Sequence, residues 1–104
     1  MASAKAVLDI LRSRAETALV TLSAQPYEAL AALPPVSSEE ILGFPKSATL
    51  TTYRDELPQG KMRVVVQLVV KGILGTARIW AKGFFLLPSS QPVPATDEEL
   101  YEFF

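Results

Sequence analysis

The sequence predicts an α+β domain in which helices come first and an antiparallel meander of strands follows. Three observations support this prediction. Apolar residues recur at helical spacing near the N-terminus, they alternate in long segments of the second half, and short turn sequences separate these segments. Helices gathered before strands favour antiparallel pairing over a parallel βαβ arrangement. The 104 residues fit one domain, spanning 1–104, with a single hydrophobic core.

The first expected element is an amphipathic helix over about residues 4–22. Its apolar side chains follow one another at intervals of three and four, which places them on one stripe of the helix. They are Val7, Leu8, Leu11, Ala15, Ala18, Leu19 and Leu22. The pairs Lys5–Asp9 and Arg12–Glu16 place opposite charges four residues apart on the exposed side.

Proline and capping signals predict two further short helices before the strands. Pro26 suits the first turn of a helix over residues 26–33, because its missing N–H would be unpaired there in any case. Pro34 and the proline after it end that helix. The sequence SSEE at residues 37–40 has the pattern of a capping box, so we expect it to open a helix of one or two turns.

A strand-like pattern begins after Pro45 and predicts a meander of three or more antiparallel strands. The expected strands are about 48–56, 61–71 and 75–87. The sequence LPQG at residues 57–60 forms the first turn, since Pro presets φ and Gly accepts the left-handed conformation. Residues 72–75 are expected to form a four-residue hairpin loop, and Gly83 is a point where the last strand can bend.

The C-terminal segment is predicted to be an extended connection followed by a short helix. Pro88, Pro92 and Pro94 disfavour a regular strand or helix between them. The sequence TDEE at residues 96–99 is a second capping-box pattern, which opens a helix over residues 97–103. The apolar residues of this end of the chain are Leu100, Tyr101, Phe103 and Phe104.

Alternation in the two longest strands sorts their side chains into two faces. In strand 61–71 the even positions are all apolar and should face the long helix. In strand 75–87 the residues expected on that core side are Ala77, Ile79, Ala81 and Phe85. The outer face then combines cations with large apolar side chains. These are Arg63, Lys71, Arg78, Lys82, Val65, Val69, Trp80 and Phe84.

An outer face this apolar should be covered, because exposed apolar patches beyond a few hundred Å² are uncommon in monomers. The cover can be the C-terminal segment of the same chain, a second copy, or another partner or ligand. The leading hypothesis is a small soluble, non-enzymatic interaction module that forms a homodimer or binds a protein partner through this face. The expected interface residues are Arg63, Val65, Val69, Arg78, Trp80, Phe84, Tyr101, Phe103 and Phe104.

The composition excludes several classes of chemistry. The chain has neither Cys nor His, which removes disulfides, thiolate nucleophiles and every site built on Ser-His-Asp, Cys-His or H-E-x-x-H. The carboxylates cluster at expected helix N-termini, where the helix dipole stabilises them, or beside a turn in solvent. We therefore predict no catalytic residue, no cofactor and no metal site. Enzymatic activity stays undecided, with a non-enzymatic role favoured.

The expected architecture, a long helix across a curved antiparallel sheet, resembles the cystatin-like and nuclear-transport-factor-like cone folds. The resemblance is one of fold alone, and it implies a cavity between helix and sheet that suits a small ligand or simple acid–base chemistry. A small-molecule-binding or weakly catalytic domain is therefore the alternative function. The residues expected to line its pocket are Tyr53, Arg54, Arg78 and Trp80.

Charge and hydropathy bear on partners and location. A net charge of −1 argues against a nucleic-acid partner, because nucleic acids bind basic domains. The apolar runs are far shorter than the roughly 20 residues that span a bilayer, and charged residues interrupt the N-terminal apolar stretch. We therefore expect no membrane segment and a cytoplasmic protein.

Overall fold

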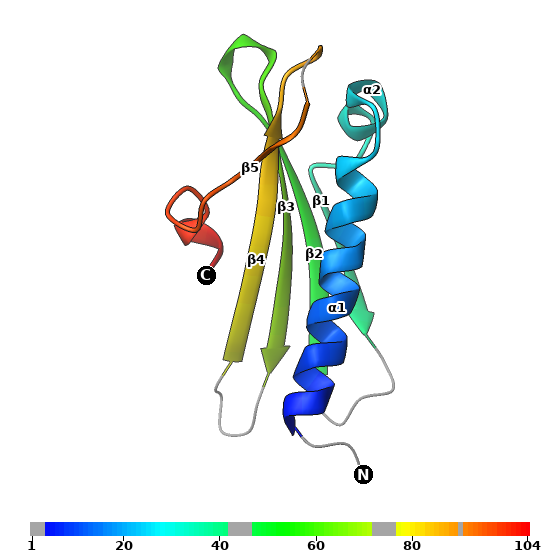
Figure 1. The fold of residues 1–104 in the computed structure, drawn as a ribbon, viewed down its shortest axis with the longest axis vertical. Helices are drawn as coiled ribbons and strands as arrows, with labels where there is room; N and C mark the ends of the chain where they lie inside the picture. The colour runs from blue at the N-terminus through cyan, green and yellow to red at the C-terminus, as the bar shows by residue number, and fades with distance from the viewer. Residues whose placement is uncertain (1–3, 42–46, 72–76, 90) are drawn as a thin grey trace.

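The fold is a long helix and a short helix on an antiparallel sheet, which confirms the predicted α+β class. The computed structural model of the chain (Figure 1) describes residues 4–41, 47–71, 77–89 and 91–104. The sheet has five strands in the order β1-β2-β3-β4-β5, and each strand pairs antiparallel with the next. The order in the sheet is the order in the sequence, as in a meander.

The first helix, α1 (Ala4–Ser23), is the predicted amphipathic helix. Val7, Leu11 and Ala15 are buried in a hydrophobic cluster between this helix and the sheet. The opposite side of the helix is in solvent, where Ile10 is exposed. The apolar stripe at helical spacing therefore selects the side that packs on the sheet.

The second helix, α2 (Tyr27–Ala31), directly follows Pro26, as the proline signal predicts. The carbonyl oxygen of Pro26 accepts hydrogen bonds from the N–H groups of Ala29 and Leu30. Leu30 is buried in a second cluster that closes the upper end of the core.

The segment Val36–Ile41 is strand β1, so the short helix predicted from residues 37–40 is wrong. β1 pairs along its length with β2 (Ser47–Glu56). A helix stopped by Gly43 and Pro45 would have only one or two turns, and such short helices are marginal. Pairing with β2 along all six residues supplies a ladder of backbone hydrogen bonds instead.

The central hairpin consists of β2 and β3 (Met62–Lys71), joined at the predicted turn. Gly60 adopts a φ of 76°, the left-handed conformation that the turn pattern requires. Gln59 has a φ of 67°, which is uncommon for a residue with a side chain. The phenolic hydroxyl of Tyr27 donates to the Gly60 carbonyl oxygen at 2.7 Å and fastens α2 to this turn.

The inner face of β3 confirms the predicted pattern. Its even-numbered residues are all buried against α1 and α2. They are Met62, Val64, Val66, Leu68 and Val70.

The predicted faces of β4 (Ala77–Leu86) are wrong. Phe84 is buried in the cluster that contains Val64, and Trp80 packs against the cluster formed with α1. Both side chains therefore lie on the helix side of the sheet and not on its outer face. The outer face of β4 carries the residues that the alternation pattern assigns to the core. These are Ala77, Ile79, Ala81 and Phe85.

The register of the β3–β4 hairpin explains this error. β3 pairs Lys71 with Ala77, whereas the expected four-residue loop over residues 72–75 would pair Lys71 with Thr76. Because side chains alternate along a strand, a shift of one residue exchanges its two faces. The loop prediction itself falls outside the described residues.

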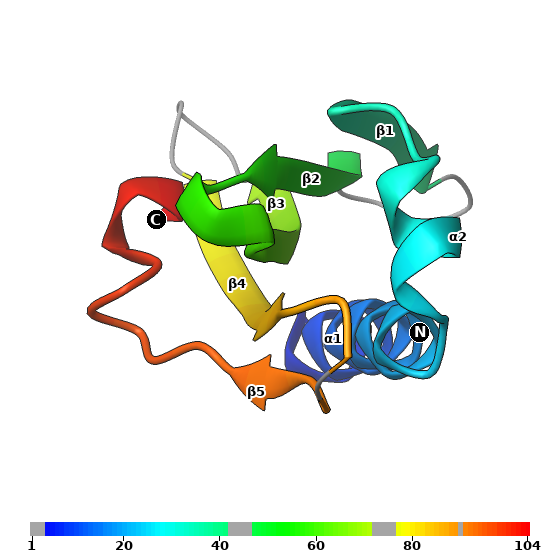
Figure 2. The ribbon, with the colours of Figure 1, turned by 90° about the horizontal axis from the view of Figure 1, so that it is seen from above.

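The chain ends on the outer side of the sheet (Figure 2). β5 (Val93–Pro94) pairs only with Phe84 and Phe85 at the end of β4. The predicted helix over residues 97–103 is a turn followed by one 3-10 turn, Tyr101–Phe103. We call residues 95–104 the C-terminal segment. In Figure 2 the sheet separates this segment from α1.

Gly83 lies where β3 and β4 approach each other closely. A Cβ atom at this position would lie 2.5 Å from the carbonyl oxygen of Val64. We expect Gly83→Ala to lower the free energy of unfolding by about 1–3 kcal/mol, because a backbone oxygen cannot move aside without disturbing the ladder. Urea unfolding of the two proteins measures the difference.

Gly60→Asn is the control for this substitution. A Cβ atom at Gly60 would make only an ordinary contact, 3.8 Å from Pro88 Cγ. Since Asn tolerates a positive φ better than other residues with side chains, we expect a loss below about 1 kcal/mol. A larger loss at Gly60 than at Gly83 would contradict the close-approach argument.

Candidate functional site

The middle of the outer face is covered by the C-terminal segment of the same chain. Val65 and Ala81 on the sheet form a buried cluster with Leu100 and Phe103 from this segment. Val65 and Leu100 are each 0% exposed. We call these four residues the outer cluster. The sequence analysis names three candidates that could cover this face. In the structure, the C-terminal segment of the same chain covers its middle.

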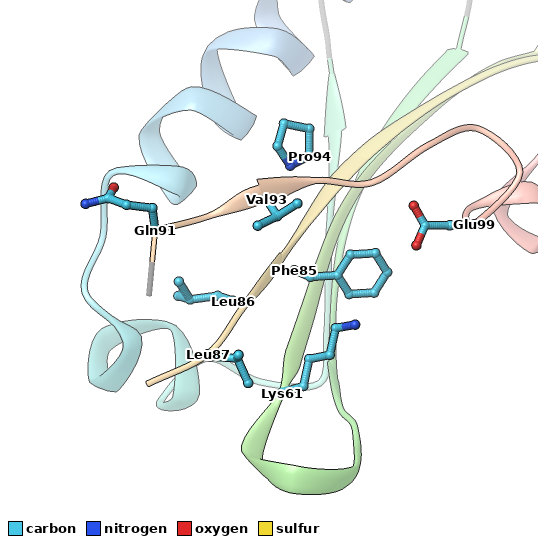
Figure 3. Close-up of a pocket in the computed structure, with 8 residues that line it drawn as sticks. All are labelled: Lys61, Phe85, Leu86, Leu87, Gln91, Val93, Pro94 and Glu99. Atoms are coloured by element: carbon cyan, nitrogen blue, oxygen red, sulfur yellow. The ribbon is translucent and has the colours of Figure 1, made fainter. Parts of the chain in front are cut away.

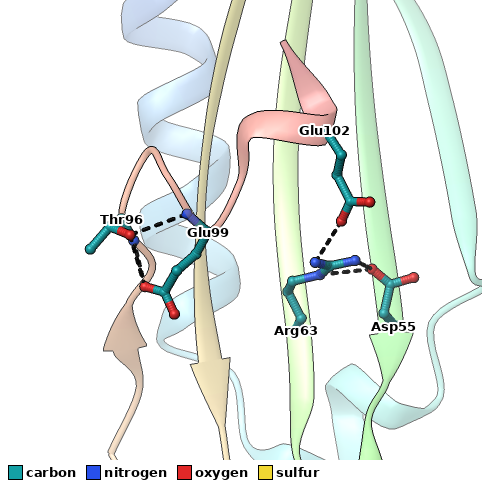
Figure 4. Close-up of polar contacts among 5 residues, drawn as sticks. All are labelled: Asp55, Arg63, Thr96, Glu99 and Glu102. Carbon is teal, nitrogen blue, oxygen red and sulfur yellow. Dashed lines mark hydrogen bonds and ion pairs between the residues drawn. The ribbon is translucent and has the colours of Figure 1, made fainter.

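Polar contacts centred on Arg63 hold the C-terminal segment in place (Figure 4). The Nε and Nη2 groups of Arg63 donate to Asp55 Oδ2 at 3.0 and 2.7 Å. Its Nη1 group lies 2.7 Å from Glu102 Oε1, and its guanidinium lies 5.0 Å from the centre of the Phe103 ring. Burial opposes the charge of Arg63, but the hydrogen bonds and charges of Asp55 and Glu102 outweigh it and raise its pKa.

A second set of contacts joins Tyr53, Gln67 and Phe103. The Tyr53 hydroxyl donates to Gln67 Oε1 at 3.1 Å, and Gln67 Nε2 donates to the Phe103 carbonyl oxygen. The rings of Tyr53 and Phe103 lie with centroids 5.0 Å apart. Tyr53 therefore helps to fix the C-terminal segment.

The turn that begins the C-terminal segment is the predicted capping box, here without a full helix behind it. The N–H of Thr96 donates to Glu99 Oε1 at 3.0 Å, and the N–H of Glu99 donates to Thr96 Oγ1 at 3.2 Å. The hydrogen bonds from the Thr96 backbone and side chain lower the pKa of Glu99. Lys82 also reaches Asp97 Oδ1 at 3.2 Å, an exposed ion pair that adds little stability.

Most of the predicted interface residues are therefore used within the chain. Val65, Phe84 and Phe103 are buried, and Arg63 is engaged by two carboxylates. Trp80 packs on the inner side. The predicted interface residues that stay at least partly accessible outside these contacts are Val69, Arg78, Tyr101 and Phe104.

The half of the outer face beyond the outer cluster is only partly covered. Val69 and Ile79 face each other in the next outer-face pair after Gln67 and Ala81. Ile79 is 39% exposed, and Val69 belongs to none of the hydrophobic clusters that the described residues form. We call this surface the bare half of the outer face. Its residues are Ser47, Thr49, Val69, Lys71, Ala77 and Ile79.

The four predicted pocket residues do not converge on one cavity. Arg78 and Trp80 do line a space between α1 and β4, but its volume is only about 60 Å³. Arg54 Nε donates to the Leu33 carbonyl oxygen at 2.8 Å, and Tyr53 lies on the other face of the sheet. A space of that size is far below the roughly 300 Å³ of a small ligand site.

A larger cleft of about 280 Å³ lies at the crossing of β4 and β5 (Figure 3). Its wall is mostly apolar, and its two charged residues are Lys61 and Glu99. The residues that line it are Lys61, Phe85, Leu86, Leu87, Gln91, Val93, Pro94 and Glu99. Lys61 Nζ lies 4.4 Å from the centre of the Phe85 ring. The sequence pattern does not indicate this cleft, because it depends on where β5 crosses β4.

Comparison of the chain with known proteins found no match. No family model, curated protein or solved structure matches it. Within the described ranges, no helix is long and apolar enough to cross a membrane. The same part of the chain has no group of three or more acidic residues arranged to hold a metal ion.

Phe103 and Phe104 offer a matched test of the outer cluster. Phe103 is buried, whereas Phe104 is 52% exposed. We expect Phe103→Ala to lower the free energy of unfolding by about 3 kcal/mol, because it opens a cavity over Val65. Phe104→Ala should change it by less than about 0.5 kcal/mol. Denaturant unfolding measures both, and equal losses would show that the cluster does not hold the segment.

Proposed function

We propose that this chain is a non-enzymatic interaction module that self-associates or binds a protein partner through the bare half of its outer face. The homodimer is the first assembly to test, because the experiment requires only this polypeptide. A cytoplasmic location is part of the same proposal.

The observation that carries the proposal is the apolar pair Val69 and Ile79, of which Val69 is half-buried and Ile79 exposed. Both lie in the same face as the outer cluster, and the C-terminal segment stops short of them. Polar and small residues surround the pair, so the surface has an apolar centre and a polar rim, as protein interfaces do. Tyr101, which is 78% exposed, and Phe104 add apolar surface on the neighbouring segment.

The sheet also makes this surface rigid. Val69 lies on β3, which has a strand on either side, so its backbone is held by two ladders. A rigid surface loses little conformational entropy when a partner binds. The proposed interface therefore stands on the best-supported strand of the molecule.

Val69→Lys tests the face, with Val20→Lys as its matched control. Val20 is an exposed valine on α1, 66% exposed, and lies outside the bare half. We expect Val69→Lys to weaken the dimer at least about tenfold, because the ammonium group would be desolvated at the interface. Val20→Lys should leave the dimer unchanged. Sedimentation equilibrium of the wild type and both variants measures the dissociation constants.

The melting temperature of each variant at low concentration shows whether the monomer stays folded. A wild type that is monomeric in sedimentation would overturn the dimer. Equal effects of the two substitutions would overturn the assignment of this face.

A second candidate function is the binding of a small apolar carboxylate, and the cleft between β4 and β5 favours it. The cleft has the volume of a small ligand, and Phe85 and Val93 provide apolar contacts. Lys61 is the cation at its edge. An aliphatic carboxylate would place its chain against Phe85 and its charge near the Lys61 ammonium.

Octanoate is a suitable probe for this cleft, with octanol as the uncharged control. We expect octanoate to shift the amide resonances of Phe85 and Val93 and to bind more tightly than octanol. Lys61→Gln should weaken octanoate about two- to fivefold, the value of an exposed ion pair, and leave octanol unchanged. Titration followed by NMR measures both affinities. Shifts spread over the whole surface would contradict a defined site.

A further inference from the structure

The sheet has two open edges, and they carry opposite charges. β1 is the first strand of the sheet, so no other strand among the described residues pairs with the edge of Val36–Ile41 that points away from β2. β5 pairs with Phe84 and Phe85 at the end of β4, so within the described part of the chain residues 77–82 of β4 have no neighbouring strand on that side. The β1 edge carries Glu39 and Glu40, and the β4 edge carries Arg78 and Lys82.

On both edges, the backbone N–H and C=O groups that point away from the sheet belong to residues whose side chains lie on the outer face. The Arg54 N–H donates to the Pro35 carbonyl oxygen, so the odd-numbered residues of this segment point toward β2. The even-numbered residues Val36, Ser38 and Glu40 therefore point away from the sheet. In β4 the Gly83 carbonyl oxygen accepts from the Ala95 N–H on the open side. Ala77, Ile79 and Ala81 share that direction, because backbone groups alternate along a strand.

Residues of β1 and β4 also lie in the same rows across the sheet, where a row is the set of residues that pair with one another from strand to strand. Ile41 of β1 is in the same row as Arg78 of β4, through the pairs Ile41–Ala48, Ala48–Val70 and Val70–Arg78. Ser38 is likewise in the row of Ala81. Residues 37–41 of β1 therefore fall in the rows of residues 82–78 of β4, and Val36 falls in the row of Gly83, whose carbonyl oxygen already accepts from the Ala95 N–H. A β1 strand from another copy can continue the rows without a shift along the strand direction.

Charge selects this pairing over the other pairings of open edges. In this register, Glu39 of one copy lies beside Trp80 of the other, with Arg78 and Lys82 on its two diagonals. Among the described residues, Glu39, Glu40 and Arg78 have no ion-pair partner within the chain, whereas Lys82 already lies 3.2 Å from Asp97 Oδ1. Arg78 is therefore the cation of this edge that is free to pair with Glu39. Two β1 edges would oppose carboxylates to each other, and two β4 edges would oppose cations, which is unfavourable.

We propose that a second copy of this chain adds its β1 edge to the open stretch of β4. The inference goes beyond the proposed function, because it uses the edges of the sheet and not its outer face. The contact is head-to-tail, so the dimer keeps one free β1 edge on one copy and one free β4 edge on the other. Association therefore continues past the dimer, and salt weakens it because the pairing charges are exposed.

Charge exchange between the edges tests the pairing in the full chain. The first variant, Glu39→Lys with Glu40→Lys, has two basic edges. The second variant, Arg78→Glu with Lys82→Glu, has two acidic edges. We expect sedimentation velocity to show wild-type species larger than a dimer that grow over roughly 0.01–1 mM protein. Neither variant alone should form species larger than the outer-face dimer, and an equimolar mixture should form larger species again, because every edge contact then joins unlike edges.

Circular dichroism and the melting temperature establish that both variants are folded. A mixture of folded variants that forms no species larger than either variant forms alone overturns the proposal, and so does a variant that associates alone as the wild type does. If a charge-exchanged variant does not fold, Arg78→Gln and Glu39→Gln replace it. Each should weaken wild-type association several-fold, and an unchanged association with either overturns the pairing.

Different substitutions disrupt the outer-face dimer and the edge pairing, so the two proposals can be tested separately. Val69 lies on β3, two strands from β1 and one strand from the β4 edge, so Val69→Lys leaves both edges intact. If association of the copies is unchanged in the charge-exchange variants but is lost in Val69→Lys, the copies associate through the bare half of the outer face. An association that survives Val69→Lys and follows the charge exchange belongs to the edges.

Discussion

The register between β3 and β4 determines most of this structure. Because Lys71 pairs with Ala77, the bulky Phe84 and Trp80 lie under the helices, and small Ala81 lies on the other side of the sheet. A register shifted by one residue would place the aromatic rings outside and remove them from the core. The small outer side chain at Ala81 is also what allows Leu100 and Phe103 to pack closely on Val65.

The sheet consequently has apolar clusters on both faces, and this explains the high apolar content of a short chain, 49% of its residues. α1 and α2 cover the inner face, and the C-terminal segment covers the middle of the outer face. Arg63 is central to the outer side, because it binds Asp55 on the neighbouring strand and Glu102 on the segment. Its charge thus links the sheet to the end of the chain, and Gln67 adds a bond to the Phe103 carbonyl.

Elements that depend on local pattern could be predicted from the sequence, and those that depend on pairing could not. The stripe of α1, the proline before α2 and the turn at Gly60 act within a few residues, and each forms as predicted. β1 could not be predicted, because residues 37–40 satisfy a local capping pattern and gain more from β2. Which face of the sheet each β4 side chain occupies depends on the β3–β4 register, and a difference of one residue in the length of the connecting loop changes that register. The cleft beside Phe85 depends on the crossing of β5, which no local pattern encodes.

The ends of the sheet show how the chain treats its exposed backbone. At the upper end of β4, Val93 pairs with Phe85, and Pro92 and Pro94 beside it lack the N–H groups that could extend the ladder. The lower stretch of β4 carries Arg78 and Lys82 instead, and β1 carries Glu39 and Glu40. Charges of one sign on every edge would prevent all pairing between copies, which is how charged residues protect an edge. Here the two edges have opposite signs, so the charges that keep like edges apart leave unlike edges free to meet.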